Sequence, residues 1–147
     1  MKSRIETGFT LIELMVTLII VAILASAAIP ALQSTLATSD LNAAQENFIQ
    51  ILNKARGLAM ARSTIAVVSI SGKVATLTLA DNSSPSLAYT ASNRVSVNEA
   101  ATYTFNPVGT AAVSSVSGAT VLSSTDFSTI LPRTITVSVT GVVNVSR

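Results

Sequence analysis

The sequence predicts an α+β protein in which one long N-terminal helix packs on a small antiparallel β-sheet domain. Three observations predict this fold. The apolar run from Phe9 to Ile29 contains a single charged residue, and a membrane-spanning helix needs about 20 mainly apolar residues. Apolar residues then recur at helical spacing as far as Arg62. Beyond Ser63 the pattern changes to short runs rich in Val, Thr and Ala, broken by turn residues, which is typical of strands.

The first helix carries one acidic residue, Glu13, near the start of its apolar run. A carboxylate is costly in hydrocarbon, so an acid at this position predicts a function, here pairing with a partner charge. Lys2 and Arg4 precede the run, and the next cation is Lys54. The positive-inside rule therefore predicts a single-pass chain with a cytoplasmic N-terminus and the remainder across the membrane.

A secretory signal peptide is the alternative for this segment, because small residues at 25–28 resemble a cleavage site. Two features favour a helix that is retained. The apolar region of a signal peptide usually lacks an acid, and the helical pattern continues beyond Pro30 without a break in phase. The expected apolar stripe of the continuing helix consists of Leu32, Leu36, Leu41, Ala44, Phe48, Ile51, Ala55, Leu58 and Arg62.

The remainder of the chain predicts strands joined by tight turns. One hairpin is expected over 64–70 and 73–79 around Ser71-Gly72, and a terminal hairpin over 134–139 and 142–145 around Thr140-Gly141. Further strands are expected at 86–90, 94–97 and 102–105. The segment 110–125 is rich in Ser, Thr, Ala, Val and Gly, and its pattern gives no assignment.

Composition argues against catalysis. The chain has no His and no Cys, so the commonest general base, a thiolate nucleophile and a disulfide framework are all absent. The sequence contains no phosphate-binding loop, and the acids Asp81, Glu99 and Asp126 are too widely spaced for a calcium-binding loop. We therefore expect neither enzymatic activity nor a cofactor nor a metal ion. The net charge of +2 does not demand an acidic partner.

The run Gly8-Phe9-Thr10-Leu11-Ile12-Glu13-Leu14-Met15-Val16 closely resembles the processing and methylation motif of type IV prepilins. The resemblance implies cleavage between Gly8 and Phe9 by an inner-membrane prepilin peptidase, followed by N-methylation of Phe9. It also implies that Glu13, the fifth residue of the mature chain, pairs with the terminal amine of a neighbouring subunit in a helical filament. Pro30 matches the position at which pilin helices commonly kink.

The resemblance divides the chain into four parts: a cleaved leader at 1–8, a transmembrane and filament-core helix at 9–29, its amphipathic continuation at 30–62, and a periplasmic β-rich domain at 63–147. Simple geometry agrees with the implied pairing. Cleavage leaves an ammonium group on Phe9, and Glu13 follows about 6 Å further along a helix. Pairing between subunits offsets the desolvation of both charges.

A weaker resemblance extends over the β-rich part. Residues 55–70, 103–109 and 135–145 are similar to H-type pseudopilins and to minor pilins of the FimT and FimU type. This implies a structural subunit near the tip of a type IV pilus or a type II secretion pseudopilus, since both machines use the same leader and helix. The implied partners are other pilin or pseudopilin subunits, the prepilin peptidase and methyltransferase, the inner-membrane assembly platform and membrane lipid.

Two alternatives remain open on the sequence. Some FimT-like minor pilins bind DNA through a basic C-terminal stretch after a Gly-Arg pair, but here Gly141 is followed by Val142. We therefore do not expect nucleic acid as a partner, although a few cations could gather in space: Lys73, Arg94, Arg133 and Arg147. The second alternative is a soluble secreted domain that follows an ordinary signal peptide.

Overall fold

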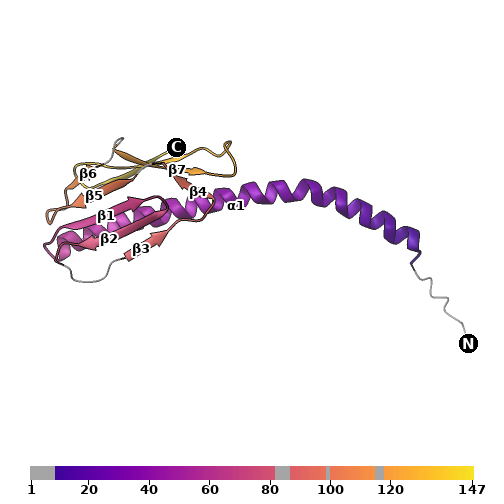
Figure 1. Ribbon diagram of the computed structural model, residues 1–147, viewed down its shortest axis with the longest axis horizontal. Coiled ribbons are helices and arrows are strands. Elements are labelled where there is room, and N and C mark those ends of the chain that lie inside the picture. The colour runs from indigo at the N-terminus through magenta and orange to yellow at the C-terminus, as the bar shows by residue number, and fades with distance from the viewer. Residues whose placement is uncertain (1–8, 82–86, 99, 115–117) are drawn as a thin grey trace, which may run out of the picture. The chain divides into compact units, whose positions relative to one another are not determined.

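The computed structural model describes residues 9–81, 87–98, 100–114 and 118–147 (Figure 1). The chain divides into two units, Met1–Thr35 and Leu36–Arg147, which are described in turn. Helix α1, Leu11–Ala61, contributes residues to both units. Gly8 and the predicted cleavage point after it lie outside the described residues.

The first unit consists of the N-terminal part of α1, which is long and apolar enough to cross a membrane. Its large apolar side chains are exposed, from 50% at Val16 to 87% at Phe9. The hydroxyl groups of Thr17, Ser26 and Ser34 each donate to the backbone carbonyl three residues earlier, at 2.7–2.9 Å. These polar side chains are thus hydrogen-bonded within the helix, as an apolar environment requires.

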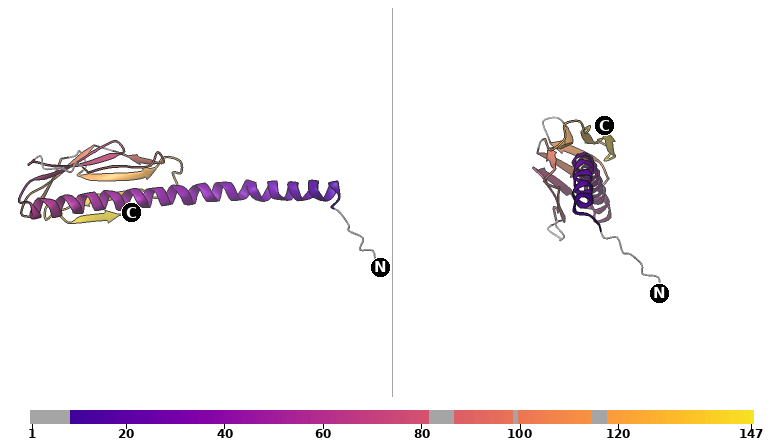
Figure 2. Two further views of the ribbon diagram at one scale, coloured as in Figure 1. Left: turned by 90° about the horizontal axis from the view of Figure 1, so that it is seen from below. Right: turned by 90° about the vertical axis from the view of Figure 1, so that its right-hand side faces the viewer.

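The second unit places two antiparallel sheets against the C-terminal part of α1 (Figure 2). The first sheet has the order β3-β2-β1-β5-β6. Its strands are β1 Ala66–Ser71, β2 Val74–Leu79, β3 Leu87–Thr90, β5 Ala101–Phe105 and β6 Ala111–Ser114. The second sheet has the order β4-β7-β8-β9. Its strands are β4 Val95–Val97, β7 Ala119–Ser124, β8 Arg133–Val137 and β9 Val143–Ser146.

The predicted α+β fold is confirmed, with the difference that the strands form two sheets rather than one. Strand β4 pairs with β7, with Val95 opposite Ser124, instead of joining the hairpins that flank it in the chain. The segment 110–125, whose pattern predicted no particular structure, supplies β6 to one sheet and β7 to the other. Within these two strands, buried and more exposed positions alternate.

Both predicted hairpins are present. The first closes with Ser71 opposite Val74, and Gly72 in its turn has a φ of 55°, which glycine adopts at little cost. The terminal hairpin is looser than predicted. Its last pair is Val137 opposite Val143, so β8 ends two residues before the predicted position 139. The loop between β8 and β9 is therefore longer than the predicted two-residue turn. At its base the backbone N–H of Ser138 donates to the Val142 carbonyl, and the backbone N–H of Val142 donates to the Ser138 hydroxyl.

The buried face of α1 differs from the predicted stripe at both ends. Leu32 and Leu36 are 60% and 43% exposed, Leu58 is half-buried and Arg62 is exposed. The buried helix residues are Ala37, Leu41, Ala44, Phe48, Ile51, Leu52, Ala55 and Ala59. Half of these are alanines, which let the helix backbone approach the sheets closely. The prediction included Ala44 and Ala55 but missed Ala37, Ala59 and Leu52.

One buried polar contact joins the two sheets. The hydroxyl of Tyr103 on β5 lies 2.7 Å from the Thr120 hydroxyl on β7, and both side chains are fully buried. Burial raises the pKa of Tyr103 above its ordinary value, while the hydrogen bond to Thr120 acts in the opposite direction. Each hydroxyl thus has a partner that the other sheet supplies.

We expect Tyr103→Phe to lower the free energy of unfolding by about 1–3 kcal/mol, because the Thr120 hydroxyl is then left buried without a partner. Denaturant unfolding of the full chain in detergent micelles, followed by circular dichroism, measures this change. The double variant Tyr103→Phe/Thr120→Val is the control, since it removes both polar groups and is expected to recover part of the loss. A double variant that is less stable than Tyr103→Phe would contradict this account.

Candidate functional site

The candidate site is the start of helix α1, where Thr10 and Glu13 form a closed hydrogen-bonded pair. Helix α1 begins at Leu11, so Thr10 occupies the N-cap position and Glu13 the third helical position. The backbone N–H of Thr10 donates to Oε2 of Glu13 at 3.0 Å, and the Thr10 hydroxyl donates to the same oxygen at 3.1 Å. The backbone N–H of Glu13 lies 3.3 Å from the Thr10 hydroxyl oxygen.

This arrangement is a capping box, in which an N-cap Thr and a Glu three residues later satisfy each other's free backbone groups. The first turn of a helix leaves its N–H groups without acceptors, which is most costly where water is scarce. The carboxylate also lies at the positive end of the helix dipole, where a negative charge is stabilised. The structure therefore gives Glu13 an intramolecular role, and its role between subunits stays a prediction.

Glu13 was predicted only as a partner for a neighbouring subunit, and the capping box was missed. The signal was present as Thr10-x-x-Glu13 directly before an apolar helix. Phe9 precedes the helix with an 87% exposed side chain. Pro30 lies inside α1, where its missing N–H leaves the carbonyl of Ser26 without the usual intrahelical bond. The kink at Pro30, the cleavage and the methylation remain predictions.

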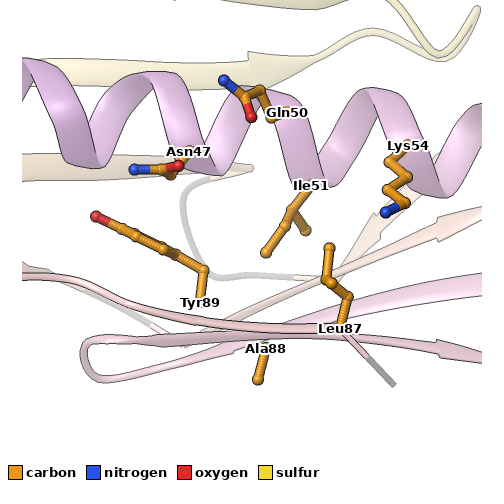
Figure 3. Close-up of a pocket in the computed structure, with 7 residues that line it drawn as sticks. All are labelled: Asn47, Gln50, Ile51, Lys54, Leu87, Ala88 and Tyr89. Atoms are coloured by element: carbon orange, nitrogen blue, oxygen red, sulfur yellow. The ribbon is translucent and has the colours of Figure 1, made fainter. Parts of the chain in front are cut away.

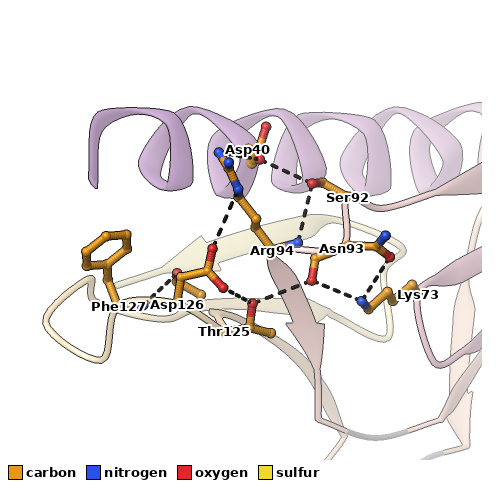
Figure 4. Close-up of polar contacts among 9 residues, drawn as sticks. Asp40, Lys73, Ser92, Asn93, Arg94, Thr125, Asp126 and Phe127 are labelled. Atoms are coloured by element: carbon orange, nitrogen blue, oxygen red, sulfur yellow. Dashed lines mark hydrogen bonds and ion pairs between the residues drawn. The ribbon is translucent and has the colours of Figure 1, made fainter. Parts of the chain in front are cut away.

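A second group of polar side chains joins elements of the second unit (Figure 4). Arg94, just before β4, lies 3.9 Å from the Asp40 carboxylate on α1 and 3.5 Å from the Asp126 carboxylate after β7. Ser92 donates to Asp40 at 3.1 Å, and Lys73 donates to the backbone carbonyl of Asn93 at 3.1 Å. The three charged side chains of the ion pairs are more than one-third exposed, so each pair contributes little.

The cations Lys73 and Arg94 therefore bond to this chain's own acceptors, while Arg133 and Arg147 lie together on the β8–β9 hairpin. In the part of the chain that the structure describes, no three acidic side chains are close enough to hold a metal ion.

A shallow pocket of about 260 Å³ lies between α1 and β3, and Figure 3 shows the side chains that line it. The helix supplies Asn47, Gln50, Ile51 and Lys54, and the strand supplies Leu87, Ala88 and Tyr89. The Tyr89 ring packs edge-on against Phe48, with ring centroids 5.7 Å apart. The walls are mixed apolar and amide groups, which provide contact area rather than a nucleophile with its base.

Comparison with known proteins gives two findings. Residues 3–29 match the prokaryotic N-terminal methylation motif. Two crystal structures of the type IV minor pilin FimU from Pseudomonas aeruginosa (strain PAO1), in space groups P21 and P65, have the same fold at 17% sequence identity. Their TM-scores are 0.55 and 0.53, over 75% and 73% of this chain and 90% and 93% of theirs. The comparison with curated protein sequences found no match.

The chain therefore carries the N-terminal methylation motif in its first segment and is similar in fold to a solved type IV minor pilin. The predicted resemblance to minor pilins of the FimU type is therefore confirmed, by a methylation motif that covers the first segment and by a fold that extends over most of the chain.

We expect Thr10→Ala to weaken the start of α1 by about 1 kcal/mol, as is usual for loss of an N-cap hydroxyl. Thr10→Ser is the matched control, because serine keeps the hydroxyl and is an equally good cap. Amide hydrogen exchange of residues 11–14 in detergent micelles measures the fraying directly. Equal exchange in the wild-type chain and in Thr10→Ala would show that the capping box does not stabilise this turn.

Proposed function

We propose that this chain is a minor pilin, a structural subunit that assembles through its N-terminal helix into a filament. The observation that supports it most is the placement of Glu13. This single acid lies at the start of a long apolar helix, within the methylation motif, and its carboxylate faces the end of the chain that processing would create. The resemblance of the fold to FimU supports the same assignment.

The exposed apolar surface of the first unit supplies the driving force. Its large apolar side chains are at least 50% exposed, and apolar surface in water costs about 25 cal/mol per Å². Such a helix requires lipid or other helices around it. We propose that membrane lipid covers it before assembly and that equivalent helices of neighbouring subunits cover it in the filament core.

The two carboxylate oxygens of Glu13 can serve different purposes, one in capping the helix and the other in pairing with an adjacent subunit. Oε2 accepts both bonds from Thr10, whereas Oε1 has no hydrogen-bond partner among the described residues. After cleavage between Gly8 and Phe9, the new ammonium group of an adjacent subunit can bond to Oε1 without breaking the capping box. Pairing in the apolar core would then set the axial register between subunits.

The proposal includes partners and a location. A prepilin peptidase and methyltransferase would process the chain, and an inner-membrane assembly platform would insert it into the filament. The chain would cross the bacterial inner membrane once, with its N-terminus cytoplasmic and the second unit periplasmic. The second unit would supply lateral contacts near the tip, where a minor subunit serves to begin assembly. A type IV pilus and a type II secretion pseudopilus can both use this architecture.

We expect the mature chain in cells to begin at Phe9 and to carry one additional methyl group on its amine. Mass spectrometry of the purified chain's N-terminal peptide measures both features. A chain that begins near Ile29 would instead support an ordinary signal peptide and would contradict the proposal.

We expect Glu13→Gln to be processed normally and to be depleted from the filament fraction by about tenfold or more. The amide oxygen can still cap the helix, but the ammonium group loses its counter-charge, and an unpaired buried charge costs about 3–5 kcal/mol. Quantitative immunoblotting of sheared filaments measures the depletion. Glu46→Gln is the matched control, because Glu46 is an exposed acid on the same helix within the second unit. Equal incorporation of both variants would refute the role of the Glu13 charge.

A further inference from the structure

Arg133, the first residue of β8, is a buried cation without an acidic partner. Its side chain faces α1, and the residue is only 6% exposed. One terminal nitrogen donates to the Asn42 side-chain oxygen at 3.2 Å, and the other lies 3.5 Å from the backbone carbonyl of Leu131. The remaining nitrogen, Nε, is buried and has no acceptor at all. A guanidinium group is always charged in proteins, so this charge is held by two neutral acceptors.

A second arginine, Arg147, adds another positive charge close to Arg133. The pairing of Thr134 with Ser146 in the β8–β9 hairpin places Arg147 beside Arg133. Burial lowers the pKa of Arg133 below its ordinary value, and the positive charge of Arg147 lowers it further. Like charges opposite each other on adjacent strands are destabilising. Both ion pairs identified in the described part of the chain use Arg94, so neither of these two cations is neutralised there.

We propose that Arg133 and Arg147 form a receptor for a carboxylate carried by another pilin-type subunit. Each terminal nitrogen of Arg133 carries two N–H groups, and its planar fork matches the two oxygens of a carboxylate. Arg147 is exposed and lies just beyond β9, the edge strand of its sheet, so a partner's carboxylate can approach the buried Arg133 from the side of Arg147. The exposed Leu131, at 63%, provides an adjacent apolar contact.

We infer the ligand of this receptor, a carboxylate of a neighbouring subunit, from the charges of the two arginines. This inference rests on the proposed function. An acidic side chain of a neighbouring subunit removes the repulsion between the two guanidinium groups and gains bonds that are strong because they are charge-assisted. Two cations offer few contacts to a nucleic-acid backbone, whose binding increases with the number of phosphates neutralised. The receptor would thus contribute specificity to a lateral contact of the second unit, separate from the Glu13 site in the first unit.

Arg147→Glu tests this directly, because it places an acid of this chain opposite Arg133 and so fills the receptor from within. We expect the variant to have a higher thermal midpoint than the wild-type chain in detergent micelles. In cells, we expect roughly tenfold less of it in the sheared filament fraction, since the partner's acid is now repelled. Arg147→Gln is the matched control: it removes the repulsion without supplying an acid, so we expect its thermal midpoint to lie between those of the wild-type chain and Arg147→Glu, and we expect it to incorporate better than Arg147→Glu.

Each result decides between specific explanations. If Arg147→Glu is more stable but incorporates as well as the wild-type chain, Arg133 is a structural cation and the receptor is refuted. If Arg147→Glu is not stabilised relative to Arg147→Gln, Arg133 does not lack a partner, and the proposal fails. If duplex DNA is shifted in a gel by the wild-type chain and not by Arg147→Glu, the occupant is a phosphate, which overturns the assignment to a subunit. Absence of the wild-type chain itself from filaments would refute the proposed function instead.

Discussion

The structure depends on how one carboxylate is accommodated at the start of an apolar helix. Glu13 lies where water is expected to be scarce, and a free charge there would be costly. The capping box with Thr10 gives one carboxylate oxygen two donors and leaves the other available. The same contact therefore completes the first turn of the helix and keeps a negative charge in position for a cation. This explains why the acid can persist within a run that is otherwise apolar.

The second unit depends on close packing between small side chains on the helix and larger ones beside them. Alanines on the buried face of α1 bring the helix near both sheets, and Phe48 and Leu52 fill the space beside them. A few hydrogen bonds then fix the positions of the two sheets and of α1 within the second unit. Tyr103 bonds to Thr120 between the sheets, and Arg56 on α1 donates to the carbonyls of Gly109 and Thr140 on two separate loops. Such contacts specify one arrangement among several that apolar packing alone would allow.

The fold is shared with FimU at 17% identity, which indicates that it depends on a pattern more than on particular residues. In this chain the pattern is a helix with small apolar residues on its buried face and strands whose buried and more exposed positions alternate. Arg133 and Arg147 lie in the second unit, on β8 and just beyond β9, whereas Glu13 lies within the methylation motif.

The sequence by itself determined the local features: the extent of the long helix, the turn at Gly72 and the processing motif that contains Glu13. These depend on residues within one or two turns of each other, so periodicity and turn chemistry were sufficient. Only the tertiary structure decided the division of the strands into two sheets and the burial of Arg133 against Asn42, 91 residues away in the chain. Long-range pairings of this kind depend on which strands meet in space, and the short Ser/Thr/Val runs are too similar to one another to specify that choice locally.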